Sequence, residues 1–150
     1  EALAGADAAT GASTAAAEFS LTALTFLLVE DNENVRDALG AMLVHLGARV
    51  IAAADGEEAL RAFGERGEGI DVVLSDVMMP GLSGPELGKR LRALDPDVRL
   101  IFCTGYLGDV ELIERESLGD VPMLQKPFDT ATLTETVRAL YEKPTSHGDA

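Results

Sequence analysis

DVVLSDVMMPGLSG, residues 71–84, contains an apolar run that ends at Asp76 and continues into a loop with proline and glycine. Two other apolar runs also end in charged residues: LLVED ends in Glu30 and Asp31, and PMLQKPF contains Lys126. Apolar runs of about five residues bounded by polar ones are typical of buried strands. The carboxyl ends of parallel strands lie along one edge of a sheet, where ligands bind in open α/β folds. We therefore expect these charges to meet.

Three carboxylates and a lysine at one sheet edge predict a site for a hard cation and a phosphoryl group. Converging carboxylates repel one another unless a cation lies between them. Mg²⁺ prefers a few carboxylates together with water and phosphate oxygens. Each acid alone is a weak signal, because acids after a strand often only cap the next helix. Their occurrence together with Lys126 favours a site.

Strands and helices are expected to alternate five times from about residue 25. The strands are expected at residues 25–30, 49–54, 71–76, 99–105 and 122–125. Apolar residues at helical spacing predict helices after them, at residues 35–46, from the capping box at 55–58 to about 64–69, around 87–94, at 109–117 and around 133–141. Strands separated by helices of this length imply right-handed crossovers and a parallel sheet.

Composition limits the class of protein. The chain has 150 residues, of which 47% are hydrophobic and 25% charged, as expected for one α/β domain with an aliphatic core. A net charge of -14 argues against binding to nucleic acid or anionic lipid. No apolar stretch approaches the roughly 20 residues that cross a bilayer. Cys103 is the single cysteine, so no disulfide framework is expected, and the expected location is cytoplasmic.

The domain boundaries are expected near residues 24 and 143. Residues 1–24 contain ten alanines, three acids and no basic residue, which predicts a flexible Ala-rich linker. Residues 25–143 would form the folded domain and residues 144–150 a polar tail. Residues 1–24 lack the positively charged start of a secretory signal. The missing initiator Met indicates a segment of a longer protein, or processing.

The motifs LLVEDN, IFCTG, DVVLSDVMMPGLSG and QKPF resemble, in their content and spacing, the receiver domain of two-component response regulators. The resemblance covers about residues 25–143. It implies a flavodoxin-like, doubly wound (βα)5 fold with the parallel sheet order 2-1-3-4-5. The site would lie at the switch between strands one and three.

The resemblance also implies roles for individual residues and a metal, Mg²⁺ or Mn²⁺. The implied site residues are the phospho-acceptor Asp76, the metal ligands Glu30, Asp31, Asp76 and the backbone carbonyl of Met78, the switch hydroxyl of Thr104, and Lys126 before Pro127 in what is commonly a cis peptide. The implied partner is a histidine kinase or a histidine phosphotransfer domain. The domain itself would be a phospho-acceptor with self-phosphorylation chemistry rather than a free enzyme.

The chain departs from the family at the position three residues before Lys126. Many receivers have an aromatic residue there that turns inward on activation, whereas this chain has Met123. We hypothesise that Tyr106, or mobility at Gly105 and Gly108, replaces the aromatic switch. The alternative is that Tyr106 is an ordinary loop aromatic with a solvated hydroxyl.

The expected function is a receiver that accepts a phosphoryl group from a phosphohistidine and changes conformation. The parent protein is expected to be a hybrid sensor histidine kinase, and a stand-alone single-domain regulator is the alternative. A Mg²⁺-dependent phosphatase of similar fold is less favoured, because the first strand ends in Glu30-Asp31-Asn32 without a DxD motif. A degenerate receiver would have lost an acid or the lysine. The oligomeric state is left open.

Four other features are interpreted as structural. Cys103 is expected in the core, His45 at the negative end of a helix dipole, and Asp95-Pro96-Asp97 in a helix cap. The acidic helix at residues 109–117 is expected to be a solvated face, and a surface for a partner is the alternative.

Overall fold

The computed structural model describes residues 20–66, 69–105 and 118–142 of the chain. Its strands are β2 (Thr25–Val29), β3 (Arg49–Ala53), β4 (Val72–Asp76), β5 (Leu100–Thr104) and β6 (Met123–Gln125). Its helices are α3 (Glu33–His45), α4 (Gly56–Arg66), α5 (Gly84–Leu94) and α7 (Thr130–Glu142). The helix expected at residues 109–117 lies outside the described residues.

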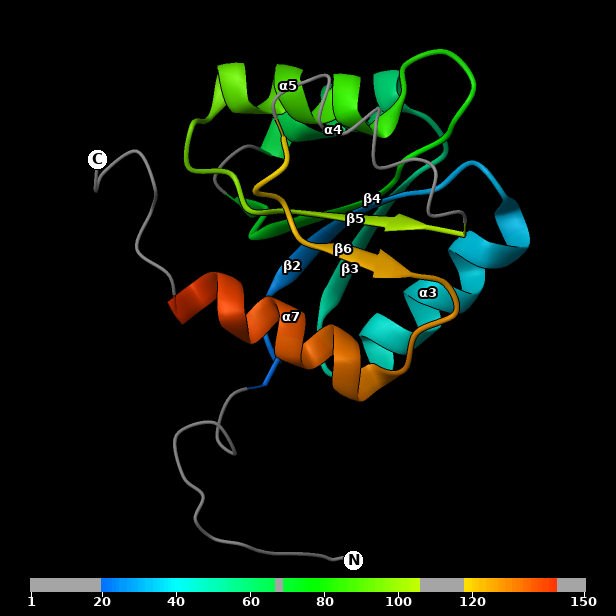
Figure 1. Ribbon diagram of the computed structural model, residues 1–150, viewed down its shortest axis with the longest axis vertical. Coiled ribbons are helices and arrows are strands. Elements are labelled where there is room, and N and C mark those ends of the chain that lie inside the picture. Colours follow the sequence, from blue (N-terminus) through cyan, green and yellow to red (C-terminus); the bar gives the residue numbers. More distant parts are fainter. Residues whose placement is uncertain (1–19, 67–68, 106–117, 143–150) are drawn as a thin grey trace, which may run out of the picture.

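The strands form one parallel sheet in the order β3-β2-β4-β5-β6. Numbered by their place in the chain, this is the order 2-1-3-4-5, so the predicted fold class is confirmed. Helices α4 and α5 cover one face of the sheet, and α3 and α7 cover the other (Figure 1). The parallel pairing of β2 with β4 places their carboxyl ends beside each other, and because the strand order reverses there, the helices that follow them lie on opposite faces of the sheet.

Side chains of the central strands alternate between two apolar cores. Leu27 and Val73 belong to the core beneath α4 and α5, whereas Phe26 and Leu74 belong to the core beneath α3 and α7. All four are fully buried. Because both faces of the strands are covered, the strands read as unbroken apolar runs rather than as alternating ones.

Two helix caps fix the chain just beyond the strand ends. Asp55 accepts the Glu58 N–H at the start of α4, and the Glu58 carboxylate accepts the Ala54 N–H, one residue earlier than in a standard capping box. A complete capping box between Ser83 and Glu86 opens α5. Both helices therefore begin at defined residues close to the charged edge of the sheet.

The packed region extends further toward the N-terminus than the predicted boundary at residue 25. Leu21 is 1% exposed in the core beneath α3 and α7. The Ala23 N–H donates to the Gly47 carbonyl, and the Arg49 N–H donates to the Leu24 carbonyl. These contacts include residues 21–24 in the domain. The linker predicted before them and the tail after residue 143 stay predictions, because they lie outside the described residues.

Three residues that could be mistaken for parts of a site have structural positions. His45 lies in the last turn of α3. Asp95 is the C-cap of α5, and its carboxylate accepts the Asp97 N–H. Cys103 is fully buried in β5, and burial raises the pKa of its thiol to about 12. Within residues 20–66, 69–105 and 118–142, none of the helices has the length and apolar character of a membrane span.

Candidate functional site

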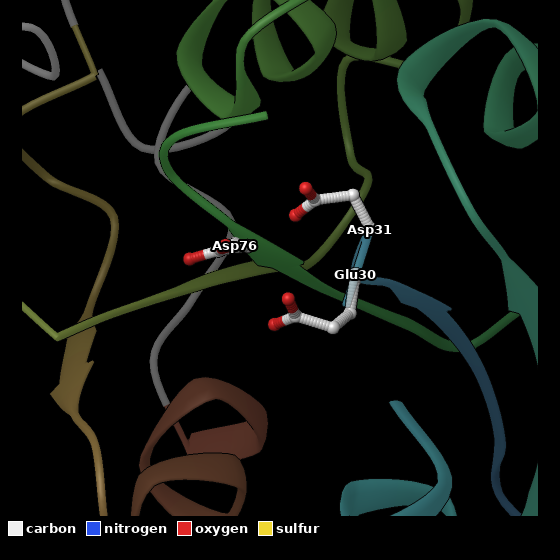
Figure 2. A group of neighbouring side chains, drawn as sticks. All are labelled: Glu30, Asp31 and Asp76. Carbon is white, nitrogen blue, oxygen red and sulfur yellow. The ribbon is translucent and has the colours of Figure 1, made fainter. Parts of the chain in front are cut away.

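Three acids meet at the carboxyl end of the sheet, as the sequence predicted. Glu30 and Asp31 follow the last residue of β2, and Asp76 is the last residue of β4. Val29 and Ser75 are partners in the β2–β4 register, so the residues that follow them lie at adjacent strand ends. One carboxylate oxygen from each acid lies within 4.8 Å of the other two. Figure 2 shows the three carboxylates gathered on the same side of the sheet edge.

Lys126 lies in the loop between β6 and α7 and joins this cluster. Its Nζ donates to Glu30 Oε1 at 2.7 Å and lies 3.4 Å from Asp76 Oδ1. Its backbone N–H donates to the Thr104 carbonyl, which continues the β5–β6 pairing by one residue. Burial lowers the pKa of Lys126, but the hydrogen bond to Glu30 and the charge of Asp76 outweigh burial and leave the pKa above its usual value.

Glu30 is almost completely buried, and both of its carboxylate oxygens are bound by donors of the protein. Oε1 accepts from Lys126 Nζ, and Oε2 accepts the Asn32 N–H at 3.2 Å. Asp31, in contrast, is exposed. The two neighbouring acids thus have different positions: Glu30 holds Lys126 at the floor of the site, whereas Asp31 lies at its open side.

Asp76 is the carboxylate whose ionisation the site perturbs most clearly. It is 9% exposed, and its Oδ1 accepts the Val77 N–H at 3.0 Å. Burial, and then the charge of Glu30, raise the pKa of Asp76 from 3.8 to about 6, although Lys126 acts in the opposite direction. The positive charge of Lys126 therefore does not offset burial and the charge of Glu30. A bound cation would stabilise the ionised carboxylate of Asp76.

The donor set fits a magnesium ion. Carboxylate oxygens are hard ligands, and an octahedral Mg²⁺ with bonds of about 2.1 Å spans about 4.2 Å between opposite ligands. The oxygens within 4.8 Å of one another could therefore surround one ion after a small inward movement, or with water in one position. Met78, whose backbone carbonyl is the fourth predicted ligand, lies in the loop that follows Asp76.

The predicted switch residues have different outcomes. Thr104 ends β5 and is fully buried beside Lys126. Met123 begins β6 opposite Phe102 and packs against the core beneath α4 and α5. Tyr106 lies outside the described residues, so the hypothesis about it stays a prediction. The Lys126–Pro127 peptide is cis, as the resemblance implied.

Two residues that contact this site were not found from the sequence. Arg36 Nη1 donates to the Glu30 carbonyl at 2.9 Å. Gly84 lies so close to Asp76 that a Cβ atom on it would be 2.2 Å from the Asp76 carbonyl oxygen. An arginine in the first turn of a helix carries no sequence signal for such a contact. A glycine just before a predicted helix only hints at a close approach.

We predict that Asp76→Asn stabilises the metal-free protein at neutral pH. In the wild type, the stabilisation that comes from protonated Asp76 is complete below pH 3.8 and is lost as the pH rises through the folded-state pKa of about 6. A shift of this size corresponds to roughly 3 kcal/mol before screening by solvent, so we expect a gain of about 1–2 kcal/mol near pH 7.5 and little difference near pH 4. Urea unfolding of both proteins in EDTA across this range measures the difference. A difference that does not change with pH would contradict the prediction.

Comparisons with known proteins agree with this geometry. Residues 26–138 match the family model of the response regulator receiver domain. The chain is 40% identical over 119 residues to the sensor kinase CckA of Brucella abortus. The matched region covers 79% of this chain and 13% of the kinase. The chain spans between 29% and 56% of the length of three further curated relatives.

Solved structures show the same relationship. The receiver domain of the hybrid histidine kinase CckA is 37% identical with a TM-score of 0.65, over 79% of this chain and 99% of that one. The response regulator TrrA of Thermotoga maritima, in complex with Mg(2+)-BeF, is 31% identical with a TM-score of 0.70, over 78% of this chain and 98% of that one. The sequence match, the sheet order and the acidic site agree, and the chain belongs to the response regulator receiver domain family.

Proposed function

We propose that this chain accepts a phosphoryl group from a phosphohistidine onto Asp76. In this proposal Mg²⁺ or Mn²⁺ is held by Glu30, Asp31, Asp76 and the backbone carbonyl of Met78. The observation that carries the proposal is the convergence of three carboxylates, within 4.8 Å of one another, on a lysine Nζ 3.4 Å from Asp76 Oδ1. The TrrA complex with Mg(2+)-BeF supports the choice of metal, because that relative shares the family.

The transfer needs positioning and charge compensation more than a strong nucleophile. A carboxylate oxygen of Asp76 forms a bond to phosphorus while the bond from phosphorus to the histidine nitrogen breaks, and the nitrogen keeps the electron pair. The product is an acyl phosphate, which water can hydrolyse. When bound, the metal ion supplies charge neutralisation for the phosphoryl oxygens. Lys126 would pair with one phosphoryl oxygen, and the Thr104 hydroxyl would donate to another.

Phosphorylation would then change contacts that the metal-free protein makes. Lys126 is bound to Glu30, so a new anion on Asp76 would compete for its Nζ. Thr104 is joined to Lys126 through the backbone, and both would respond to the same charge. Met123 and Tyr106 remain candidates for carrying the change outward. Such a response is a two-state switch of the kind that phosphoryl groups commonly bias.

The proposed partner is a histidine kinase or a histidine phosphotransfer domain. Two relatives are kinases by name, the sensor kinase CckA and the hybrid histidine kinase CckA, which supports a hybrid kinase as the parent protein. A stand-alone single-domain regulator is the alternative. Analysis of the complete reading frame would distinguish these two.

Incubation with acetyl phosphate and Mg²⁺, followed by intact mass measurement, tests the proposed function. The wild-type chain should gain the mass of one phosphoryl group, and hydroxylamine should remove it because the product is an acyl phosphate. EDTA or Asp76→Asn should abolish the gain. Asp37→Asn, which removes an exposed carboxylate of α3 outside the acidic cluster, is the matched control and should still be phosphorylated. A gain that persists in Asp76→Asn, or no gain in wild type with any small phosphodonor, would refute the proposal.

A further inference from the structure

We propose that Arg36 is a positioning residue for the metal site, because it fixes the peptide group from which Asp31 projects. This inference rests on the proposed function and deepens it. Arg36 lies in the first turn of α3 and is half-buried. It contacts the backbone of the acidic pair rather than a carboxylate, so its contribution to the site is geometric.

The contact that carries the inference is the hydrogen bond from Arg36 Nη1 to the Glu30 carbonyl at 2.9 Å. The Glu30 carbonyl and the Asp31 N–H belong to one planar peptide group. A donor that holds the carbonyl therefore sets the orientation of the plane, and with it the direction of the Asp31 side chain. The guanidinium is a charged donor, and hydrogen bonds from charged donors are stronger than those between neutral groups.

The chain changes direction within the three residues between β2 and α3. The orientation of the peptide groups there therefore needs to be fixed by hydrogen bonds. Successive side chains of a strand point to opposite faces, yet Glu30 and Asp31 both place a carboxylate oxygen in the same cluster. The Glu30 N–H is held by the Ala53 carbonyl of β3 at 3.1 Å. The Glu30 carboxylate is held by Lys126 and the Asn32 N–H. Arg36 holds the remaining polar group of Glu30, its carbonyl, and so determines how the chain leaves it.

Arg36 also has its own place fixed by the helix. Its backbone N–H donates to the Asn32 carbonyl at 2.8 Å, and the Asn32 side chain caps α3 by accepting the Val35 N–H. The guanidinium thus links the strand end to the first turn of α3. The Arg36 side chain thus adds a link between that turn and the strand end to those made by the backbone and by the Asn32 N–H.

Positioning and simple electrostatics predict opposite results when Arg36 loses its charge. A cation near three carboxylates competes with Mg²⁺, so a purely electrostatic role means that its removal tightens Mg²⁺ binding. A positioning role means that removal weakens binding, because Asp31 no longer projects in the required direction. Loss of groups that orient metal ligands typically weakens metal binding by about 10- to 100-fold. The sign of the change therefore separates the two roles.

The test is a titration of the full chain with MgCl₂ at constant ionic strength, followed by amide chemical shifts. We expect the Mg²⁺ dissociation constant of Arg36→Gln to rise about tenfold, in line with other groups that orient metal ligands. In the metal-free protein the amide signal of Asp31 should also shift or broaden. Arg49→Gln removes the same charge from an exposed residue at the opposite end of the sheet, and its dissociation constant should stay within about twofold of wild type. A dissociation constant of Arg36→Gln equal to or below that of wild type would overturn the inference.

A second variant covers the case in which Arg36→Gln does not fold. Arg36→Met keeps the alkyl stem and its packing but loses both the donor and the charge, and the same two outcomes apply to it. The phosphorylation assay separates failure of this inference from failure of the proposed function. If the wild type takes up a phosphoryl group and the Arg36 variants bind Mg²⁺ as tightly as the wild type, the inference about Arg36 fails and the proposed function stands. Wild type that takes up none refutes the proposed function.

Discussion

Lys126→Met is expected to destabilise the metal-free protein by about 2–3 kcal/mol at pH 7.5. Removing one partner of a fully buried ion pair typically costs about 3–5 kcal/mol, because the other charge stays buried without compensation. The Glu30 side chain is 2% exposed, whereas that of Lys126 is 21% exposed, so part of the cost is screened. The variant also leaves Glu30 and Asp76 facing each other without the cation that lies between them. Urea unfolding in EDTA measures the loss.

Two controls attribute this loss to the buried pair. Lys89→Met makes the same change at an exposed residue of α5, where an exposed interaction contributes at most about 1 kcal/mol, so it should alter the free energy of unfolding by no more than that. Adding Glu30→Gln to Lys126→Met should recover a large part of the stability, because a neutral amide replaces the uncompensated carboxylate. Saturating Mg²⁺ should also recover part of it, since the ion supplies positive charge at the same place. Equal losses in Lys126→Met and Lys89→Met would contradict the account.

The three central strands β2, β4 and β5 were predictable because each is a short apolar run that is buried on both faces. β4 and β5 illustrate this, since every residue of both strands is buried. The order of the strands came from the resemblance to the family rather than from periodicity. Residues 21–24 pack against the domain that was expected to begin near residue 25. Leu21 and Leu24 stand among alanines and small polar residues, and their packing depends on the α3–β3 turn, which is distant in sequence.

The acidic cluster could be predicted because parallel strands bring their carboxyl ends together. The pairing of individual donors with individual carboxylate oxygens could not be predicted. The side chains involved are long, and their conformations depend on tertiary neighbours. Lys126 binds Glu30 more closely than Asp76, a preference that no local pattern indicates. The Arg36 contact joins residues six positions apart across the start of a helix, where sequence spacing does not imply a contact.

Gly84→Ala is expected to destabilise the protein by about 3 kcal/mol or more and to slow phosphorylation of Asp76 about 100-fold. The added Cβ would lie 2.2 Å from the Asp76 carbonyl oxygen and 3.0 Å from Val77 Cα. Both are backbone atoms, so no side chain can rotate away to make room. The Gly84 N–H also donates to the Val77 carbonyl at 2.8 Å, which ties the start of α5 to the chain directly after Asp76. Urea unfolding and the rate of mass gain with acetyl phosphate measure the two effects.

Gly64→Ala is the matched control, because it adds the same methyl group in α4, where no atom of the described residues beyond its chain neighbours and the nearby backbone of the helix lies within 4 Å of the new Cβ. Alanine has a higher helix propensity than glycine, and Gly64 lies in the last turn of α4, so this variant should gain up to about 0.5 kcal/mol. The same substitution is thus expected to have opposite signs at two helical glycines. If Gly84→Ala were as stable as Gly64→Ala, Asp76 could not depend on the close packing of α5. If Gly84→Ala lost stability but kept its phosphorylation rate, the glycine would serve the fold without positioning the acceptor carboxylate.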